Sequence, residues 1–300
     1  MRSEDAPIAR YARYMDKKDL IFAGRHVVIT GGNSGIGFAA ARLFLAAGAR
    51  VTIACRNKAK SAAALAALRA EFPHGACAAL PLDLADLSSI DAFADALREK
   101  KKTDIFYHCA GVYYPNPPKT EEGLSATLTI NFTGTAYLAE KVLPLLDENG
   151  KMIFTTSLVD RFGKEENFDP RTAKKEGYGT YSASKLLLSA YVLEKSRARQ
   201  AGEPAFLAVH PGITATALLS PEKTSHKPFF SHVGHRFLFL FTQPKEKAAL
   251  TVLYAAKYGE NGDCIAPRGL FGISGYPHKT RFCHKAARTG RDAAFPETFS

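Results

Sequence analysis

A glycine-rich turn between an apolar run and a helix-like segment constrains this chain more than any other feature. The turn reads Thr-Gly-Gly-Asn-Ser-Gly-Ile-Gly over residues 30–37 and directly follows the apolar residues 27–29. Glycines here let the backbone turn sharply, approach a phosphate and pack a helix onto a strand, while free amides at the helix start face an anion. We expect a pyrophosphate site formed by Gly31, Asn33, Ser34, Gly35, Ile36 and Gly37. A purely structural turn is the alternative.

Strand-like and helix-like segments alternate along the rest of the chain. Apolar, strand-like runs cover residues 27–30, 50–54, 76–82, 104–109, 151–156 and 205–209, and helix-like segments cover 58–72, 90–97, 126–146 and 180–201. This alternation predicts an α/β fold of the Rossmann type, a doubly wound parallel sheet of about seven strands with helices on both faces. Ligands of such sheets bind beyond the carboxyl ends of the strands.

Length and composition favour one large domain. With 300 residues, 46% of them apolar, the chain can bury a core on both faces of a sheet. We expect an N-terminal extension over residues 1–23 and one catalytic domain over 24–300, with a substrate loop at about 213–243. Five dispersed cysteines show neither zinc-ligand nor disulfide spacing, and no signal peptide or membrane-spanning run is visible. A cytoplasmic location is therefore expected.

The basic charge of the chain does not by itself indicate a nucleic-acid partner. The formal net charge is +11, but the lysines and arginines are dispersed and no nucleic-acid-binding motif accompanies them. His226, His232 and His235 lack a convincing further metal ligand, so no metal is proposed.

Tyr181 and Lys185 provide a candidate acid-base pair. Four residues apart on a predicted helix, they share one face, and a cation near a phenol lowers the pKa of that phenol. Ser157 ends the fifth strand run, so its hydroxyl can polarise a substrate carbonyl at the same sheet edge. The alternatives are an ordinary helix-surface pair and a turn serine.

Asn131 is an amide in an otherwise apolar helical segment, where a buried polar group needs partners. It is either a satisfied core residue or the holder of a water beside Lys185.

At this point the chain resembles the single-domain branch of the short-chain dehydrogenase/reductase family, near its retinol-dehydrogenase-like members. Asn131, Ser157, Tyr181 and Lys185 follow the order of that family's catalytic tetrad. The resemblance implies that Tyr181 exchanges the proton, that Lys185 binds the nicotinamide ribose and lowers the tyrosine pKa, that Ser157 positions the carbonyl and that Asn131 orders a relay water. The further cofactor contacts implied are Asp83, Leu84, Ala110, Gly111, Pro211, Gly212 and Thr216. It also implies a homodimer or homotetramer built from the helices that carry Asn131 and Tyr181.

Two departures from the family pattern stand out. The family has Asn-Asn-Ala-Gly or a close variant after strand four, where this chain has His108, Cys109, Ala110 and Gly111. Cysteine cannot make the usual amide hydrogen bonds, and His108 is interpreted as a strand-end residue without a catalytic role. Residues 281–300 lack the family's closing-helix pattern.

The residues after strand two favour NADP(H) over NAD(H). The position at which an acidic residue would bind the ribose hydroxyls of NAD holds Cys55, and Arg56 follows it. A guanidinium there can pair with the 2'-phosphate of NADP, although a surface role for Arg56 is the alternative.

The phenylalanine-rich residues 229–241 indicate a lipophilic partner. They can line an apolar pocket, cover the core or a subunit contact, or meet a membrane surface. The leading hypothesis is an NADP(H)-dependent oxidoreductase acting on a small lipophilic carbonyl or alcohol. A catalytically silent NADPH-binding regulator or scaffold is the alternative.

Overall fold

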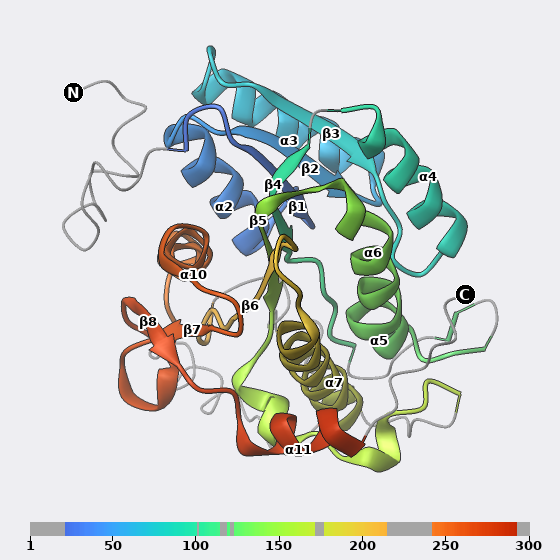
Figure 1. Ribbon diagram of the computed structural model, residues 1–300. Helices are drawn as coiled ribbons and strands as arrows, with labels where there is room; N and C mark the ends of the chain where they lie inside the picture. The colour runs from blue at the N-terminus through green and yellow to red at the C-terminus, as the bar shows by residue number, and fades with distance from the viewer. Residues whose placement is uncertain are drawn as a thin grey trace, which may run out of the picture.

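An eight-stranded sheet forms the centre of the protein, in the order β3-β2-β1-β4-β5-β6-β7-β8 (Figure 1). The computed structural model describes residues 22–100, 102–114, 119–120, 123–171, 177–214 and 242–292. Strands β1 to β7 run parallel, and β8 pairs antiparallel with β7. The strands are β1 His26–Thr30, β2 Arg50–Cys55, β3 Cys77–Pro81, β4 Thr103–His108, β5 Leu146–Thr155, β6 Ala205–Val209, β7 Cys264–Pro267 and β8 Pro277–Thr280. The predicted α/β doubly wound fold is confirmed.

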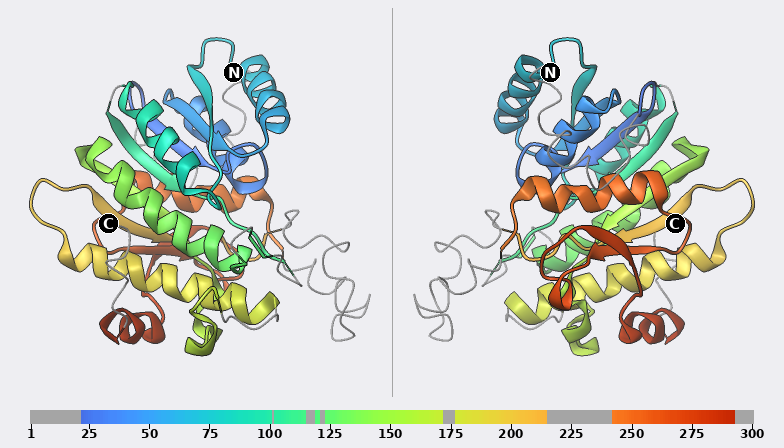
Figure 2. Two further views of the ribbon diagram at one scale, coloured as in Figure 1. Left: turned by 90° about the vertical axis from the view of Figure 1, so that its right-hand side faces the viewer. Right: turned by 90° about the vertical axis from the view of Figure 1, so that its left-hand side faces the viewer.

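Helices cover both faces of the sheet. The helices are α2 Gly35–Ala46, α3 Lys58–Glu71, α4 Leu87–Arg98, α5 Ala126–Leu128, α6 Gly134–Val142, α7 Gly177–Ala198, α10 Lys245–Tyr258 and α11 His284–Asp292. Helices α2, α3 and α10 share one apolar layer with the sheet, and α4, α6 and α7 share the other. The two views of Figure 2 place α4, α6 and α7 in front on the left and α10 in front on the right.

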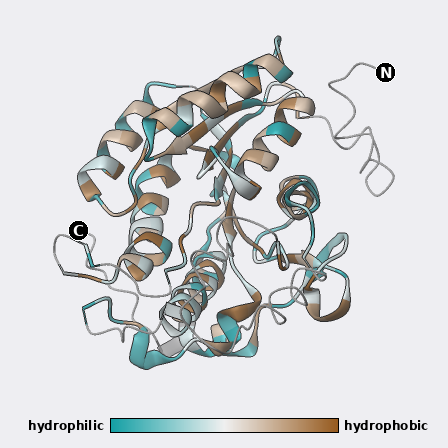
Figure 3. Cartoon of the chain, turned by 180° about the vertical axis from the view of Figure 1, so that it is seen from behind, coloured by the Kyte–Doolittle hydropathy of each residue, from teal (hydrophilic) through white to brown (hydrophobic). Residues whose placement is uncertain are grey.

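The core consists of two apolar layers on opposite sides of the strands. Along β1, Val27 and Ile29 enter one layer and Val28 enters the other, because successive side chains of a strand alternate in direction. Strands that are buried on both faces read as continuous apolar runs, which explains why the central strands were visible in the sequence. In Figure 3 the central strands are mainly apolar, whereas the covering helices carry both hydrophobic (brown) and hydrophilic (teal) residues.

The strand order places a switch point between β1 and β4. From β1 the chain proceeds through β2 and β3 toward one edge, and from β4 onward it proceeds toward the other edge. In doubly wound sheets, this is the position at which the carboxyl ends of the strands leave room for a ligand.

Four elements differ from expectation. An eighth strand, β8, is present, but its four residues are too short and polar to show a strand pattern. The predicted helix 126–146 is divided by a π-helical turn, Thr129–Thr133, and β5 already begins at Leu146. Helix α7 begins at Gly177 rather than at residue 180. Residues 281–300 lack a closing-helix pattern in the sequence, yet a helix, α11, forms there and packs against α7.

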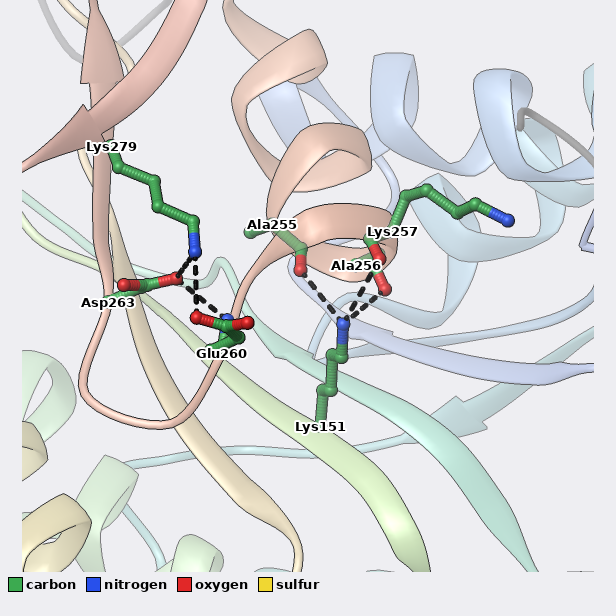
Figure 4. A network of polar contacts seen from close by, with 7 residues as sticks. All are labelled: Lys151, Ala255, Ala256, Lys257, Glu260, Asp263 and Lys279. Carbon is green, nitrogen blue, oxygen red and sulfur yellow. Dashed lines mark hydrogen bonds and ion pairs between the residues drawn. The ribbon is translucent and has the colours of Figure 1, made fainter. Parts of the chain in front are cut away.

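The edge of the sheet opposite the strand carboxyl ends is held by two lysines (Figure 4). The ammonium of Lys151 on β5 donates to the Ala256 carbonyl at the end of α10 at 2.8 Å, and burial lowers its pKa to about 8. Lys279 on β8 pairs with Glu260 at 3.0 Å and Asp263 at 2.9 Å. A cation at a helix C-terminus compensates its unpaired carbonyls. These contacts fix α10 and β8 to the sheet.

Candidate active site

Six of the sequence-predicted site residues lie at one edge of the sheet. Each follows the carboxyl end of a parallel strand: Gly31 after β1, Arg56 after β2, Asp83 after β3, Ala110 after β4, Ser157 after β5 and Pro211 after β6. The parallel registers of these strands bring all six ends to the same side.

The glycine turn has the geometry expected of a phosphate cradle. Gly31 has φ +67°, and a Cβ on it would lie 3.0 Å from the Cα of Ala110. A Cβ on Gly37 would lie 2.5 Å from the carbonyl oxygen of Gly31. Helix α2 begins at Gly35, and its N-cap residue Ser34 makes no side-chain capping bond. The helix start therefore keeps free amides for an anion, as NAD(P) phosphates require.

The residues after β2 form the side of the site where the adenosine ribose of a dinucleotide would lie. Cys55 is buried, and its thiol lies against the backbone amides of Gly31, Gly32 and Asn33. The Arg56 side chain is 63% exposed, and Nη1 lies 3.7 Å from the Asp83 carboxylate. The guanidinium can thus reach an anion in solvent, but it already has Asp83 as a long-range partner.

The segment after β4 is tied to β1 and to the π-helical turn. The hydroxyl oxygen of Thr30 accepts hydrogen bonds from the amides of Cys109 and Ala110, both at 3.0 Å. A Cβ on Gly111 would lie 3.3 Å from Oδ1 of Asn131 and 3.5 Å from Nζ of Lys185. The absence of a side chain at Gly111 therefore leaves space beside two members of the predicted tetrad.

Asn131 acts as a clamp on that segment. Its buried carboxamide accepts from the amide of Val112 at 2.8 Å and donates to the carbonyl of Val112 at 2.9 Å. The second donor goes to the hydroxyl of Ser184 on α7 at 3.1 Å. Both amide hydrogens of Asn131 bind protein groups, so the side chain positions the loop after β4 and helix α7. One lone pair of Oδ1 is left for a water. The π-helical turn that carries Asn131 is of a kind frequent at functional sites.

Tyr181, Ser157 and Lys185 are brought together at the start of α7. The Ser157 hydroxyl is hydrogen-bonded to the phenol of Tyr181. The ammonium of Lys185, one helical turn further, lies 5.9 Å from the centre of the tyrosine ring. It donates to the carbonyl of Thr155 at the end of β5 at 2.8 Å. The Tyr181 and Lys185 pair of one helix and Ser157 from a strand end, predicted from two separate segments, therefore converge.

The electrostatics of this trio differ from expectation in one respect. Burial raises the pKa of Tyr181 to about 12, with the hydrogen bond from Ser157 opposing the shift. The predicted lowering by Lys185 is thus wrong for this state of the protein, because desolvation of the phenolate outweighs it. Burial also lowers the pKa of Lys185 to about 8.

Pro211 and Gly212 follow β6 and are held by a residue that the sequence did not indicate. The side-chain amide of Gln243 donates to the Pro211 carbonyl at 2.6 Å, and its Oε1 accepts from the amide of Gly275 at 3.1 Å. Gly212 has φ +72°, and a Cβ there would lie 2.3 Å from the carbonyl of Ile273. The predicted contact Thr216 lies outside the described residues, as does most of the expected substrate loop.

The unusual pair His108 and Cys109 does not take part in the trio directly. His108 is buried, and its ring stacks on Phe154 with 4.3 Å between centroids and 2° between planes. Burial lowers its pKa to about 3. The thiol of Cys109 contacts the hydroxyl groups of Tyr107 and Thr155, so hydroxyl contacts replace the amide bonds of the family pattern.

One aromatic contact of the site was missed. Tyr113 packs edge-on against Tyr181, with centroids 5.5 Å apart and planes at 71°. It lies two residues after Gly111, so its place past a strand end is the only sequence signal that could have indicated it. Across the described ranges, no helix is both long and apolar enough to cross a membrane.

Comparison with known proteins places this geometry in context. Residues 25–227 match the family model described as short chain dehydrogenase. Retinol dehydrogenase 14 of Mus musculus is 32% identical over 252 residues, which cover 77% of this chain and 73% of that protein. Retinol dehydrogenase 12 of Homo sapiens is 33% identical over 200 residues, 65% of this chain and 63% of that protein. The match therefore spans somewhat less than two thirds of the human protein.

Solved structures share the fold. A protein of Mycobacterium Paratuberculosis, described as uncharacterized, is 28% identical and superposes with a TM-score of 0.68, covering 90% of this chain and 91% of that one. A short chain dehydrogenase from Shigella flexneri, solved in complex with NADP, is 21% identical with a TM-score of 0.65, covering 82% of this chain and 97% of that one.

Proposed function

The chain belongs to the short chain dehydrogenase family, and we propose that it transfers hydride between NADP(H) and a lipophilic carbonyl or alcohol. The observation that carries the proposal is the convergence of the Tyr181 phenol, the Ser157 hydroxyl and the Lys185 ammonium beside the glycine turn. The proton-transfer groups and the expected phosphate cradle lie at one edge of the sheet.

Each residue has one task in the proposed reduction. Ser157 donates a hydrogen bond to the carbonyl oxygen of the substrate and fixes its position against Tyr181. Tyr181 donates its phenolic proton to the same oxygen as negative charge develops there. Lys185, anchored on Thr155, holds a cation next to the phenol and stabilises the tyrosinate that remains. When bound, NADPH would supply the hydride.

The pKa of Tyr181 is compatible with its task as a proton donor near neutral pH. A phenol whose pKa is raised to about 12 is protonated and ready to donate. Alcohol oxidation needs the phenolate as a base, and burial disfavours that form.

Support for NADP(H) over NAD(H) comes from the end of β2. No carboxylate stands at the position of Cys55, and Arg56 extends into solvent next to the expected ribose position. A guanidinium forms charge-assisted bonds with a phosphate group. The preference rests on that one side chain, since Lys58 and Lys60 on α3 are exposed surface residues.

Other parts of the proposal rest on the sequence. They are a lipophilic substrate, a cytoplasmic location and a homodimer or homotetramer. Light scattering of the purified protein measures the assembly, and fractionation of expressing cells measures the location.

A screen of purified protein tests the function. NADPH or NADH is mixed with hydrophobic ketones and aldehydes, and loss of nicotinamide absorbance is followed for the wild type and for Tyr181→Phe. We expect turnover with NADPH that disappears in the variant. Tight NADPH binding without tyrosine-dependent turnover would instead support the regulator or scaffold.

A further inference from the structure

A basic pocket opens beside Ser157, between the 3-10 turn Leu158–Phe162 and strands β7 and β8. Its volume is about 260 Å³. Arg161, Arg268 and Arg281 all contribute to its wall, and Ser157 lines it as well. We call it the arginine pocket. Because sites for whole small molecules span about 300–1,000 Å³, it suits one part of a substrate whose reacting end lies at Ser157.

Among the described residues, the three guanidinium groups share one carboxyl group, that of Asp160, whose pKa the charge of Arg161 acts to lower. Within the described part of the chain, none of them forms an ion pair or a hydrogen bond. The only carboxyl group among the described lining residues is Asp160, which is buried and accepts from the hydroxyl of Ser189 at 2.9 Å. Burial raises the pKa of Asp160, while the hydrogen bond from Ser189 and the charge of Arg161 oppose that shift. Three guanidinium groups against one carboxyl group leave the pocket with an excess of positive charge.

His210 gives an independent indication that an acceptor belongs in this pocket. The imidazole is 6% exposed, and burial, followed by the nearby charge of Arg161, lowers its pKa to about 4. Its Nδ1 accepts from the amide of Gly212 at 3.2 Å, so the neutral ring carries its proton on Nε2.

Among the described residues, no hydrogen-bond acceptor meets that proton. The backbone of Gly272 lies close enough to oppose the pKa shift, but it does not complete a hydrogen bond to Nε2. A buried donor without a partner costs free energy, which a bound oxyanion would remove.

We propose that the arginine pocket binds a carboxylate or phosphate group of the substrate, while the substrate carbonyl lies between Ser157 and Tyr181. This inference rests on the proposed function and defines its substrate class: an amphipathic molecule with an acidic group, rather than a purely lipophilic carbonyl. The acidic group pairs with the guanidinium groups and accepts from Nε2 of His210.

The local geometry sets the spacing between the acidic group and the carbonyl. Arg161 follows Ser157 by four positions through a 3-10 turn. At a rise of roughly 2 Å per residue, the backbone positions of the two residues lie about 8 Å apart along the turn. Leu270 and Phe271 are 78% and 74% exposed, and Phe271 lines the pocket, so an apolar part of the same molecule has a surface to contact.

Matched substrate pairs test the inference. Methyl-ketone carboxylates of increasing chain length are compared with their methyl esters and with the corresponding ketone phosphates, using NADPH and the holoenzyme. We expect kcat/KM to favour a charged member over its ester by about tenfold or more. The carboxylate and phosphate series then identify which anion the pocket prefers. Equal kcat/KM values for charged and uncharged members would overturn the inference.

The triple variant Arg161→Gln/Arg268→Gln/Arg281→Gln tests whether the arginine pocket causes the preference for charged substrates. All three side chains are exposed, so the replacements leave the core intact. We expect the charged-to-ester ratio to fall about tenfold with ester turnover unchanged. The control Arg98→Gln, on the exposed side of α4, should keep the wild-type ratio. An unchanged ratio in the triple variant would contradict the inference.

A binding measurement separates this inference from the proposed function. Isothermal titration calorimetry with hexanoate, hexyl phosphate and hexanol measures binding to the pocket without turnover. Tyr181→Phe should bind a hexyl anion as the wild type does, whereas the triple variant should bind it about tenfold more weakly. If no anion is preferred over hexanol although turnover still depends on Tyr181, the inference fails and the function stands. If anion binding holds while Tyr181→Phe turns over normally, the function fails.

Discussion

The ammonium of Lys185 donates a hydrogen bond to the backbone carbonyl of Thr155 at 2.8 Å. This contact joins the first turns of α7 to the last residue of β5, which lies two residues before Ser157. It therefore sets the distance between the predicted proton donor and the residue that positions the carbonyl. A helix start and a strand end, far apart in sequence, become one rigid unit.

The proton on Lys185 should control activity at alkaline pH. Burial lowers its pKa to about 8, so the cation is present below that pH and is lost above it. We expect kcat/KM for NADPH to fall as the pH rises through about 8, since this ratio reports groups of the free enzyme. Lys185→Arg keeps its charge and should remove the fall while lowering the rate. A wild-type profile that stays flat to about pH 10 would contradict this role.

Replacing Asn131 should loosen the loop after β4. Asn131→Leu keeps the approximate volume but leaves the amide and carbonyl of Val112 without their partners. We expect a loss of about 1–3 kcal/mol in the free energy of unfolding in urea, and faster exchange of the Val112 amide hydrogen. Ser184→Ala removes only one of the three bonds of Asn131 and should cost less. Equal effects of the two changes would count against the clamp.

Acid should destabilise the fold through His108. Its pKa is about 3 when folded and about 6.5 when unfolded, so between these values the unfolded chain binds more protons. Stability is therefore lost as the pH falls below about 6.5, at about 1.4 kcal/mol per pH unit for one such group.

The variant His108→Phe tests that prediction, because phenylalanine keeps the stacking on Phe154 and cannot be protonated. Between about pH 7 and about pH 5, the wild type should lose about 2 kcal/mol more than the variant in urea unfolding. The exposed control His74→Gln should behave as the wild type does. Parallel losses in wild type and His108→Phe would show that another group causes the acid sensitivity.

Arg56 should decide the choice of dinucleotide. Arg56→Ala removes the guanidinium that lies 3.7 Å from Asp83. We expect the Kd for NADPH to rise about tenfold or more, with the Kd for NADH nearly unchanged. Lys60→Ala provides a matched loss of charge on α3 and should change neither value. If the ratio of the two Kd values survives Arg56→Ala, the preference has another origin.

The parts of the fold that sequence could predict are those with a repeated pattern. The strand-turn-helix at residues 26–46 was visible because a fully buried strand meets glycines and a helical stripe. Ser157 was visible because it follows a strand end, and Tyr181 and Lys185 because they share one helix face. Asn131 was visible as an amide in an otherwise apolar helical segment. Such signals are local in the sequence, and a parallel sheet brings the residues that follow its strands together at one edge.

The rest depends on contacts that leave no periodic trace. The π-helical turn 129–133 shifts hydrogen bonds by one residue without any composition signal. Among the α11 residues whose burial is described, only Ala286 and Thr289 are buried, so this part of the helix has no apolar stripe. Arg161, Arg268 and Arg281 come from three segments that meet only because β8 folds back on β7. The raised pKa of Tyr181 likewise follows from three-dimensional burial.

Single-turnover hydride transfer in Tyr181→Phe tests the central claim most directly. Enzyme preloaded with NADPH is mixed with a carbonyl substrate, and nicotinamide absorbance is followed in the wild type, in Tyr181→Phe and in the control Tyr113→Phe, which keeps the edge-on ring contact. The account predicts that Tyr181→Phe slows the step by about 10²–10⁴-fold with NADPH affinity unchanged, while Tyr113→Phe stays within about tenfold of the wild type. A Tyr181→Phe rate equal to that of the wild type would contradict it.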